Sequence, residues 1–255
     1  MKKILILIFI FSPALGFGQE NHDYLDIYTK ASHAYDAYKY NEALLMYNEL
    51  ITSNELWNKF TSKKKIEIYQ KTINSQLKKS PNFNQHNFNQ AITLANQSVT
   101  MIGGITDKKD LEEYFTEYYV NISFSIAKYD INSALDYLLI GAKQSRDNKY
   151  AQVLLGKVDD LLLDSKNTFK DKQAITEKIE KSIQIRKERK LESFAGFLSL
   201  GIACYQKDFN MLALLAYQEA MTAAKSSNNV NKVVRTYYLK NLPKVSKNNQ
   251  FKLSK

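Results

Sequence analysis

The string Asn210-Met211-Leu212-Ala213-Leu214 decides the fold, because four similar strings precede it in the chain. They are Tyr40-Asn41-Glu42-Ala43-Leu44, Phe88-Asn89-Gln90-Ala91-Ile92, Ile131-Asn132-Ser133-Ala134-Leu135 and Asp171-Lys172-Gln173-Ala174-Ile175. Each string places Ala and then Leu or Ile just inside the start of an expected helix, and the Ala-to-Ala steps are 48, 43, 40 and 39 residues. A small residue that returns at such a period is typical of a helical repeat array.

Hydrophobic periodicity predicts five helical hairpins and one further helix. Ala213, Ala216, Tyr217 and Ala220, for example, lie at i, i+3, i+4 and i+7, on one face of a helix. The expected hairpins pair residues 24–38 with 41–52, 62–79 with 87–101, 111–128 with 132–146, 150–163 with 171–187, and 191–206 with 210–225. A last helix is expected over residues 230–242. The chain has only 8 Gly and 3 Pro, too few for many tight turns between strands, so we expect an all-α fold.

The charge pattern does not favour a nucleic-acid partner. The formal net charge of the 255 residues is +10, but the lysines are spread along the chain and Arg occurs at only four positions. A nucleic-acid-binding surface gathers Lys and Arg on one element. The run Lys63-Lys64-Lys65 stands at an expected helix start, and we interpret it as a solvated helix end.

The two ends of the chain are expected to lie outside the repeats. Lys2 and Lys3 precede an apolar run over residues 4–11, and Gly16 and Gly18 follow it. This order is typical of a secretory signal peptide over residues 1–18, and the apolar run is too short to span a bilayer. We therefore expect export to the periplasm or the medium, with no membrane span in the mature chain. Residues 243–255 are basic and polar, and we expect a disordered tail there.

No residue pattern predicts catalysis, a cofactor or a metal site. The only cysteine is Cys204, in an apolar stretch, and the three histidines (His22, His33 and His86) lack partners at ligand spacing. Asp159 and Asp160 are adjacent on an expected helix, so their side chains point in different directions. We therefore expect a protein that is not an enzyme.

The fifth hairpin resembles a tetratricopeptide repeat. Its first helix has Phe197, Leu200 and Gly201 at the family's aromatic, Leu and small positions. Its second helix has Ala213, Tyr217 and Ala220 at the small, aromatic and small positions. The other hairpins match in part, through Ala31, Tyr35, Tyr40, Ala43 and Tyr47 in the first, Ala91 and Ala95 in the second, Tyr118, Ala134, Leu138 and Gly141 in the third, and Leu155, Gly156 and Ala174 in the fourth.

The resemblance implies an α-solenoid of about five hairpins over residues 24–242, with the helix at 230–242 as its cap. The steps of 39 to 48 residues exceed the family's period of about 34, so longer helices or loops are expected. In this family the first helices form the concave face, which implies a peptide-binding groove lined by Tyr119, Ser123 and Ile126 of the third repeat and by Leu198, Ile202, Tyr205 and Gln206 of the fifth. Packing between repeats is the competing interpretation of these positions.

The leading functional hypothesis is a non-enzymatic, exported scaffold that binds a protein or peptide in this groove. The chain also resembles the exported repeat region of membrane-linked transcriptional regulators from the Bacteroidetes, without their membrane helix and DNA-binding domain. This similarity makes a sensor-type repeat region the second hypothesis. The third is an enzyme or a glycan-binding relative of repeat-based outer-membrane nutrient-binding proteins. The sequence identifies neither the partner nor the oligomeric state.

Overall fold

The computed structural model describes residues 23–106, 109–191, 194–224 and 236. These residues form eleven α-helices and one 3-10 turn and contain no strand, which confirms the expected all-helical fold for this part of the chain. The expected signal peptide, the tail and, apart from residue 236, the helix at 230–242 lie outside the described residues. The chain divides into two compact units, Met1–Pro81 and Asn82–Lys255. Each unit is described by itself.

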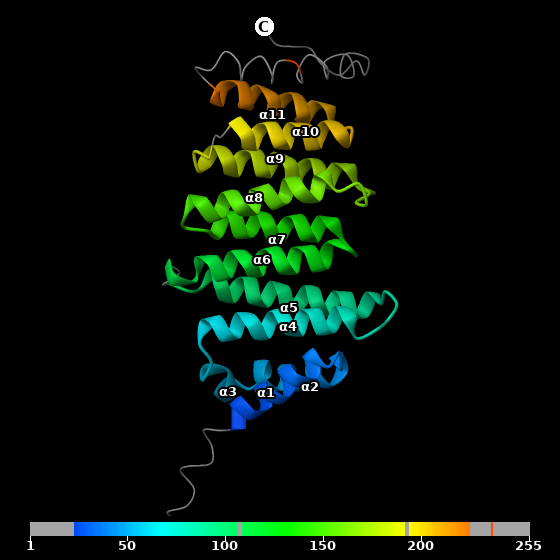
Figure 1. Cartoon of the computed structure of the whole chain (residues 1–255), viewed down its shortest axis with the longest axis vertical. Coiled ribbons are helices and arrows are strands. Elements are labelled where there is room, and N and C mark those ends of the chain that lie inside the picture. Colours follow the sequence, from blue (N-terminus) through cyan, green and yellow to red (C-terminus); the bar gives the residue numbers. More distant parts are fainter. Residues whose placement is uncertain (1–22, 107–108, 192–193, 225–235, 237–255) are drawn as a thin grey trace, which may run out of the picture. The chain divides into compact units, whose positions relative to one another are not determined.

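The first unit contains four helices, drawn in blue to cyan in Figure 1. They are α1 (Asp23–Asp36), α2 (Tyr40–Thr52), α3 (Asn54–Asn58) and α4 (Ser62–Lys78). Helix α1 packs on α2, and α2 also contacts α3 and α4. The core between them consists of small and large apolar side chains: Ala31, Ala34, Ala43, Tyr47, Leu50, Phe60 and Ile68.

Helix α3 was not predicted, and its cause is local. The Ser53 side chain accepts a hydrogen bond from the Leu56 N–H at 3.3 Å, which starts a new helix directly after α2 ends. Thr61 caps α4 in the same way, accepting from the Lys64 N–H at 3.3 Å. Ser and Thr are favoured at such positions because their oxygens satisfy N–H groups that the first helical turn leaves unpaired.

The second unit contains α5 to α11 and the 3-10 turn η1. Their bounds are α5 (Gln85–Gly103), η1 (Lys109–Leu111), α6 (Glu112–Ala127), α7 (Ile131–Gln144), α8 (Asn148–Leu163), α9 (Lys172–Glu188), α10 (Phe194–Gln206) and α11 (Asn210–Ala223). Among the described residues, the seven helices expected between residues 87 and 225 are confirmed. Four of these helices begin after a side-chain cap, supplied by Asn84, Asp130, Asp147 and Asp171.

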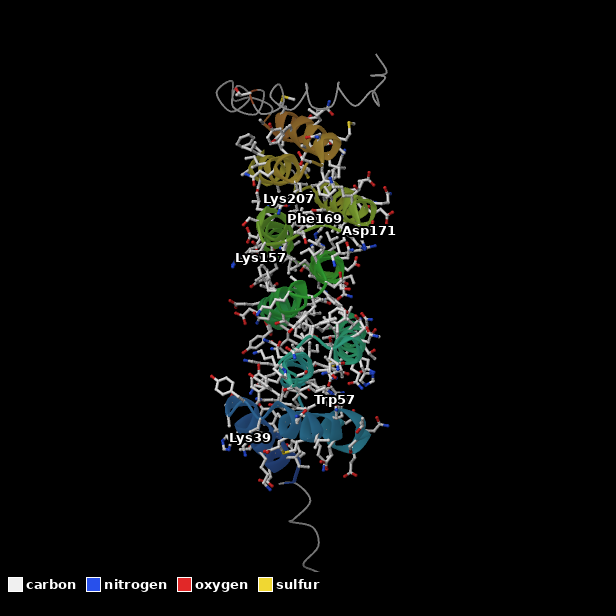
Figure 2. The ribbon with its side chains drawn as sticks, turned by 90° about the vertical axis from the view of Figure 1, so that its right-hand side faces the viewer. Lys39, Trp57, Lys157, Phe169, Asp171 and Lys207 are labelled. Atoms are coloured by element: carbon white, nitrogen blue, oxygen red, sulfur yellow. The ribbon has the colours of Figure 1, made fainter. Side chains whose placement is uncertain are left out.

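The helices of the second unit lie in two layers (Figures 1 and 2). In the first layer α8 contacts both α6 and α10. In the second layer α9 contacts both α7 and α11, and the Tyr137 hydroxyl of α7 donates to Asn96 Oδ1 of α5 at 2.9 Å. The two helices of one hairpin belong to different layers and pack against each other, as α6 does with α7 and α10 with α11. Every second helix therefore stacks on its counterpart in the neighbouring hairpin.

Small residues stand where helices cross. Among the five repeated alanines, Ala43, Ala91, Ala134 and Ala213 are fully buried, whereas Ala174 is half-buried. A side chain on Gly201 would place its Cβ only 2.3 Å from the Tyr217 ring, so Tyr217 of α11 lies directly on the α10 backbone. Such positions let two helices approach closely. In the fourth hairpin α8 and α9 are in less extensive contact than the paired helices of the third and fifth hairpins. This agrees with the longer loop between α8 and α9.

Candidate functional site

The groove positions expected in the third repeat are wrong. Tyr119, Ser123 and Ile126 lie in the core and expose 1%, 0% and 0% of their surface. The Tyr119 ring packs over Gly141 of α7, where an added Cβ would lie 2.7 Å away, and its hydroxyl donates to Gln144 Oε1 at 2.7 Å. These side chains therefore pack α6 against its neighbours. For these three positions the competing interpretation, packing between helices, describes the structure.

The four groove positions expected in the fifth repeat lie on α10, in the first layer. Leu198, Ile202 and Tyr205 are half-buried and Gln206 is exposed. They differ from the third-repeat positions in keeping part of their surface accessible. Their role in binding stays a prediction.

The accessible apolar side chains of the first layer lie elsewhere on α6 and α8. Tyr114 and Phe124 of α6 expose 37% and 38% of their surface, and Val153 of α8 exposes 42%. Phe124 lies two residues before Ile126, which corresponds to a rotation of about 200° around the helix axis. The accessible face of α6 is thus nearly opposite to the face that the repeat alignment selected.

A cleft of about 510 Å³ opens in the first layer between α8 and α10. Its walls carry both apolar and polar groups, from Gln152, Val153, Gly156, Lys157 and Asp160 of α8 and from Gly196 and Ser199 of α10. Lys157 is labelled in Figure 2, beside α8. A Cβ on Gly156 would meet no atom within 4 Å, so the cleft is open directly above the α8 backbone.

A difference between two hairpins accompanies this opening. The residue four positions after the repeated alanine is Tyr217 in the fifth hairpin, and its ring covers Gly201. In the fourth hairpin the same position holds Lys178, whose ammonium instead lies 2.7 Å from Asp136 Oδ1 of α7. No aromatic ring therefore covers Gly156 in the way that the Tyr217 ring covers Gly201.

The floor of the cleft is a buried ion pair between α8 and α9. Arg186 Nη2 donates to Asp159 Oδ2 at 2.9 Å, to Asp159 Oδ1 at 3.0 Å and to the Leu155 carbonyl at 3.2 Å. Its Nη1 donates to Ser182 Oγ at 2.8 Å. Burial raises the pKa of Asp159 to about 6, although Arg186 opposes this shift, as does a hydrogen bond from Ser199. The sequence analysis compares Asp159 only with Asp160 and does not predict Arg186 as its partner, although an arginine on the apolar face of α9 is a signal for such a pair.

The thiol of Cys204 lies outside the cleft lining. Cys204 is buried, and burial raises the pKa of its thiol, so the thiolate is disfavoured. Across residues 23–106, 109–191 and 194–224, no group of three or more His, Cys, Asp or Glu side chains is placed to hold a metal ion. The cleft presents an apolar group from Val153 and polar groups from Lys157, Asp160 and Ser199.

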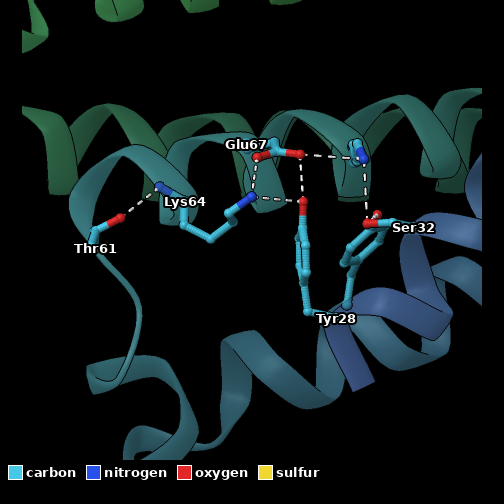
Figure 3. A network of polar contacts seen from close by, with 7 residues as sticks. Tyr28, Ser32, Thr61, Lys64 and Glu67 are labelled. Carbon is cyan, nitrogen blue, oxygen red and sulfur yellow. Dashed lines mark hydrogen bonds and ion pairs between the residues drawn. The ribbon is translucent and has the colours of Figure 1, made fainter. Parts of the chain in front are cut away.

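The first unit has a polar network between α1 and α4 (Figure 3). The Tyr28 hydroxyl donates to Glu67 Oε1 at 2.5 Å, and Lys64 Nζ donates to Tyr28 Oη at 3.0 Å and to Glu67 Oε2 at 2.8 Å. Lys71 Nζ donates to Ser32 Oγ at 3.3 Å and lies 3.3 Å from Glu67 Oε1.

Burial disfavours both charges in this network, but the hydrogen bonds outweigh it. The pKa of Glu67 is therefore lowered and the pKa of Lys64 is raised. Because the charged groups satisfy one another, we interpret the network as a tie between α1 and α4 rather than a reactive site.

No family model matches the sequence, and no curated protein matches it. Among the helices in the described part of the chain, none is both long and apolar enough to cross a membrane.

Proposed function

We propose that the chain is an exported, non-enzymatic helical-repeat scaffold of the tetratricopeptide type, which binds a protein or peptide partner along α6, α8 and α10. The support for the repeat type is the two-layer stacking of hairpins and the close packing of Tyr217 on Gly201, at the positions where the family places an aromatic and a small residue. The support for export is the composition of residues 1–18.

The main observation that supports this binding site is the cleft above Gly156. Ligand sites in proteins are concave, span about 300–1,000 Å³ and combine apolar walls with a few polar groups. The α8–α10 cleft has this size and character, with Val153 at its rim and the Arg186–Asp159 pair at its base. A repeat array offers such surfaces along the accessible face of one helical layer.

Filling the cleft should abolish partner binding without unfolding the chain. A Gly156→Trp variant places a large ring where no atom lies within 4 Å of the Cβ, so the fold can accept it. Its matched control is Gly156→Ala, which leaves most of the cleft open. The measurement is a quantitative pull-down from the envelope fraction of the native host, with wild type and both variants as bait.

The expected result is a partner enriched by wild type and by Gly156→Ala and lost with Gly156→Trp. Loss of a central anchoring contact in an interface typically costs about 2 kcal/mol or more, which is roughly thirtyfold in affinity. Thermal unfolding of all three proteins provides the check that Gly156→Trp is folded. Equal recovery of the same partner by both folded variants would place the site outside this cleft.

A further inference from the structure

We infer that a row of lysines along α4, in the first unit, binds an acidic helix of a partner protein. The row consists of Lys64, Lys71 and Lys78, each seven residues after the one before. The α8–α10 cleft belongs to the other unit of the chain, so this inference and the proposed function can fail separately.

Positive charge gathers on α4, although the lysines of the whole chain are spread. Residues 62–79 contain six lysines and one carboxylate, that of Glu67, which gives a formal net charge of +5. Glu67 lies 2.8 Å from Lys64 Nζ and 3.3 Å from Lys71 Nζ, so one negative charge faces two positive charges. The ammonium of Lys78 has no carboxylate partner among the described residues. The row therefore stays positive when its own carboxylate is counted.

The carboxylates of the other helices in this unit do not pair with the row. No ion pair joins Asp36 or Glu49 to α4 among the described residues. Three other carboxylates each pair with a lysine outside α4, so each pair is neutral as a whole: Asp26 with Lys30 at 2.6 Å, Glu42 with Lys39 at 3.4 Å and Glu55 with Lys59 at 3.6 Å. The excess of positive charge thus lies on α4, which favours an acidic partner there.

Tyrosine rings hold the ammonium groups of the row without neutralising them. The distances from Nζ to ring centroid are 4.4 Å for Lys64 over Tyr28, 5.9 and 5.7 Å for Lys71 over Tyr28 and Tyr35, and 6.0 and 5.6 Å for Lys78 over Tyr35 and Tyr40. An aromatic ring attracts a cation through its quadrupole but carries no net charge. Figure 3 shows Lys64 in this position, between Tyr28 and Glu67.

The row is also accessible. The side chains of Lys64 and Lys71 expose 37% and 21% of their surface, and Lys78 is exposed. Long side chains that are already held in place lose less entropy when a partner binds.

The spacing of the row selects a helix as the partner. Residues seven apart on a helix lie about 10.5 Å apart along its axis and only about 20° apart around it, so the row runs nearly straight along α4. A second helix laid alongside presents residues of its own seven-residue period at the same spacing. In an extended strand, residues on one face lie about 6.7 Å apart and fall out of step with the lysines.

The test is fluorescence anisotropy in low-salt buffer, with the mature chain and labelled helical peptides of three heptads. The first peptide carries six Glu on one face, two in each heptad; the second has the same composition with the Glu spread around the helix, and the third has Lys in place of Glu. We expect the first peptide to bind about fivefold more tightly than the second and the third not to bind. Equal affinity for the first two peptides would overturn the inference, because net charge alone would then explain binding.

Two double variants of α4 locate the binding. Lys71→Gln with Lys78→Gln should weaken the first peptide by about fivefold. The control, Lys65→Gln with Lys79→Gln, removes the same charge from the same helix, at positions rotated by about 100° from the row. It should change the affinity by less than about twofold, and equal losses in both double variants would contradict the inference.

A single variant covers the case in which the loss of Lys71 disturbs the fold. Lys78 is exposed and lies outside the hydrogen bonds of Figure 3, so Lys78→Gln should keep the melting temperature and weaken the first peptide by about twofold. Unchanged affinity in this folded variant would overturn the inference. A labelled single-stranded oligonucleotide that binds as tightly as the first peptide would do so too, since the surface would then attract any polyanion.

Discussion

Replacing Arg186 with Met is expected to lower the free energy of unfolding by about 3–5 kcal/mol. The substitution keeps an unbranched side chain of similar length but removes the guanidinium that holds Asp159 Oδ1 and Oδ2 at 3.0 and 2.9 Å. The side chains of both partners are almost fully buried, at 4% and 3% exposed, so the Asp159 carboxylate would be left poorly hydrated. An isolated buried carboxylate is costly, and that cost is the main part of the loss.

The control is the double variant Arg186→Met with Asp159→Leu, which removes both charges and should recover most of the lost stability. The dependence on pH gives a second readout. Burial already raises the pKa of Asp159 to about 6 beside Arg186, and without Arg186 the pKa rises further. A raised pKa in the folded state favours the protonated carboxyl, so the single variant should lose more stability at pH 8 than at pH 5. Urea unfolding at both values measures this, and an equal loss in the double variant would contradict the account.

The second large effect is expected from Gly201→Ala, which should cost about 1–3 kcal/mol. An added methyl group would stand 2.3 Å from the Tyr217 Cε1 atom, and Tyr217 is fully buried, so α10 and α11 have to move apart. This strain works against the gain in helix propensity, which for Gly to Ala is about 0.5–1 kcal/mol.

Gly156→Ala is the matched control, because Gly156 is also inside a helix but a methyl group added there would have no atom within 4 Å. It should gain about 0.5–1 kcal/mol from the same change in helix propensity. Thermal and urea unfolding of both variants separate strain from propensity. If the two substitutions shift stability in the same direction and by the same amount, the proposed packing of Tyr217 on Gly201 is wrong.

The fold could be predicted from the sequence because its determinants are local and repeated. Ala213, Tyr217 and Gly201 stand at fixed separations, and in the structure they are buried against one another's helices, as the pattern predicted. The starts of helices could also be predicted from the sequence, because Asp130, Asp147 and Asp171 are polar residues directly before apolar periodic runs. The short helix α3 was missed because it is five residues long, too short for a periodic pattern.

The candidate site could be predicted only in part. Helix α6 carries apolar residues outside its buried face as well: it buries Tyr118, Tyr119, Ile122 and Ile126 but exposes Tyr114 and Phe124. Aligning α6 to a repeat pattern therefore left its rotation undetermined, and the selected face was the buried one. The Arg186–Asp159 pair joins residues 27 positions apart, and only the packing of α9 on α8 brings them together. The cleft above Gly156 likewise depends on which side chains fail to cover it.

The central claim is that a partner binds to the first helical layer of the second unit, and site-specific photo-crosslinking tests it most directly. A photoreactive phenylalanine analogue replaces Val153 at the rim of the α8–α10 cleft in one protein, and Leu215 on α11 in the other. The two positions are matched, at 42% and 38% exposed, but belong to different layers. Irradiation in the native host should give a discrete crosslinked product from position 153 and none from position 215. A product from position 215 alone, or the same product from both, would contradict the account.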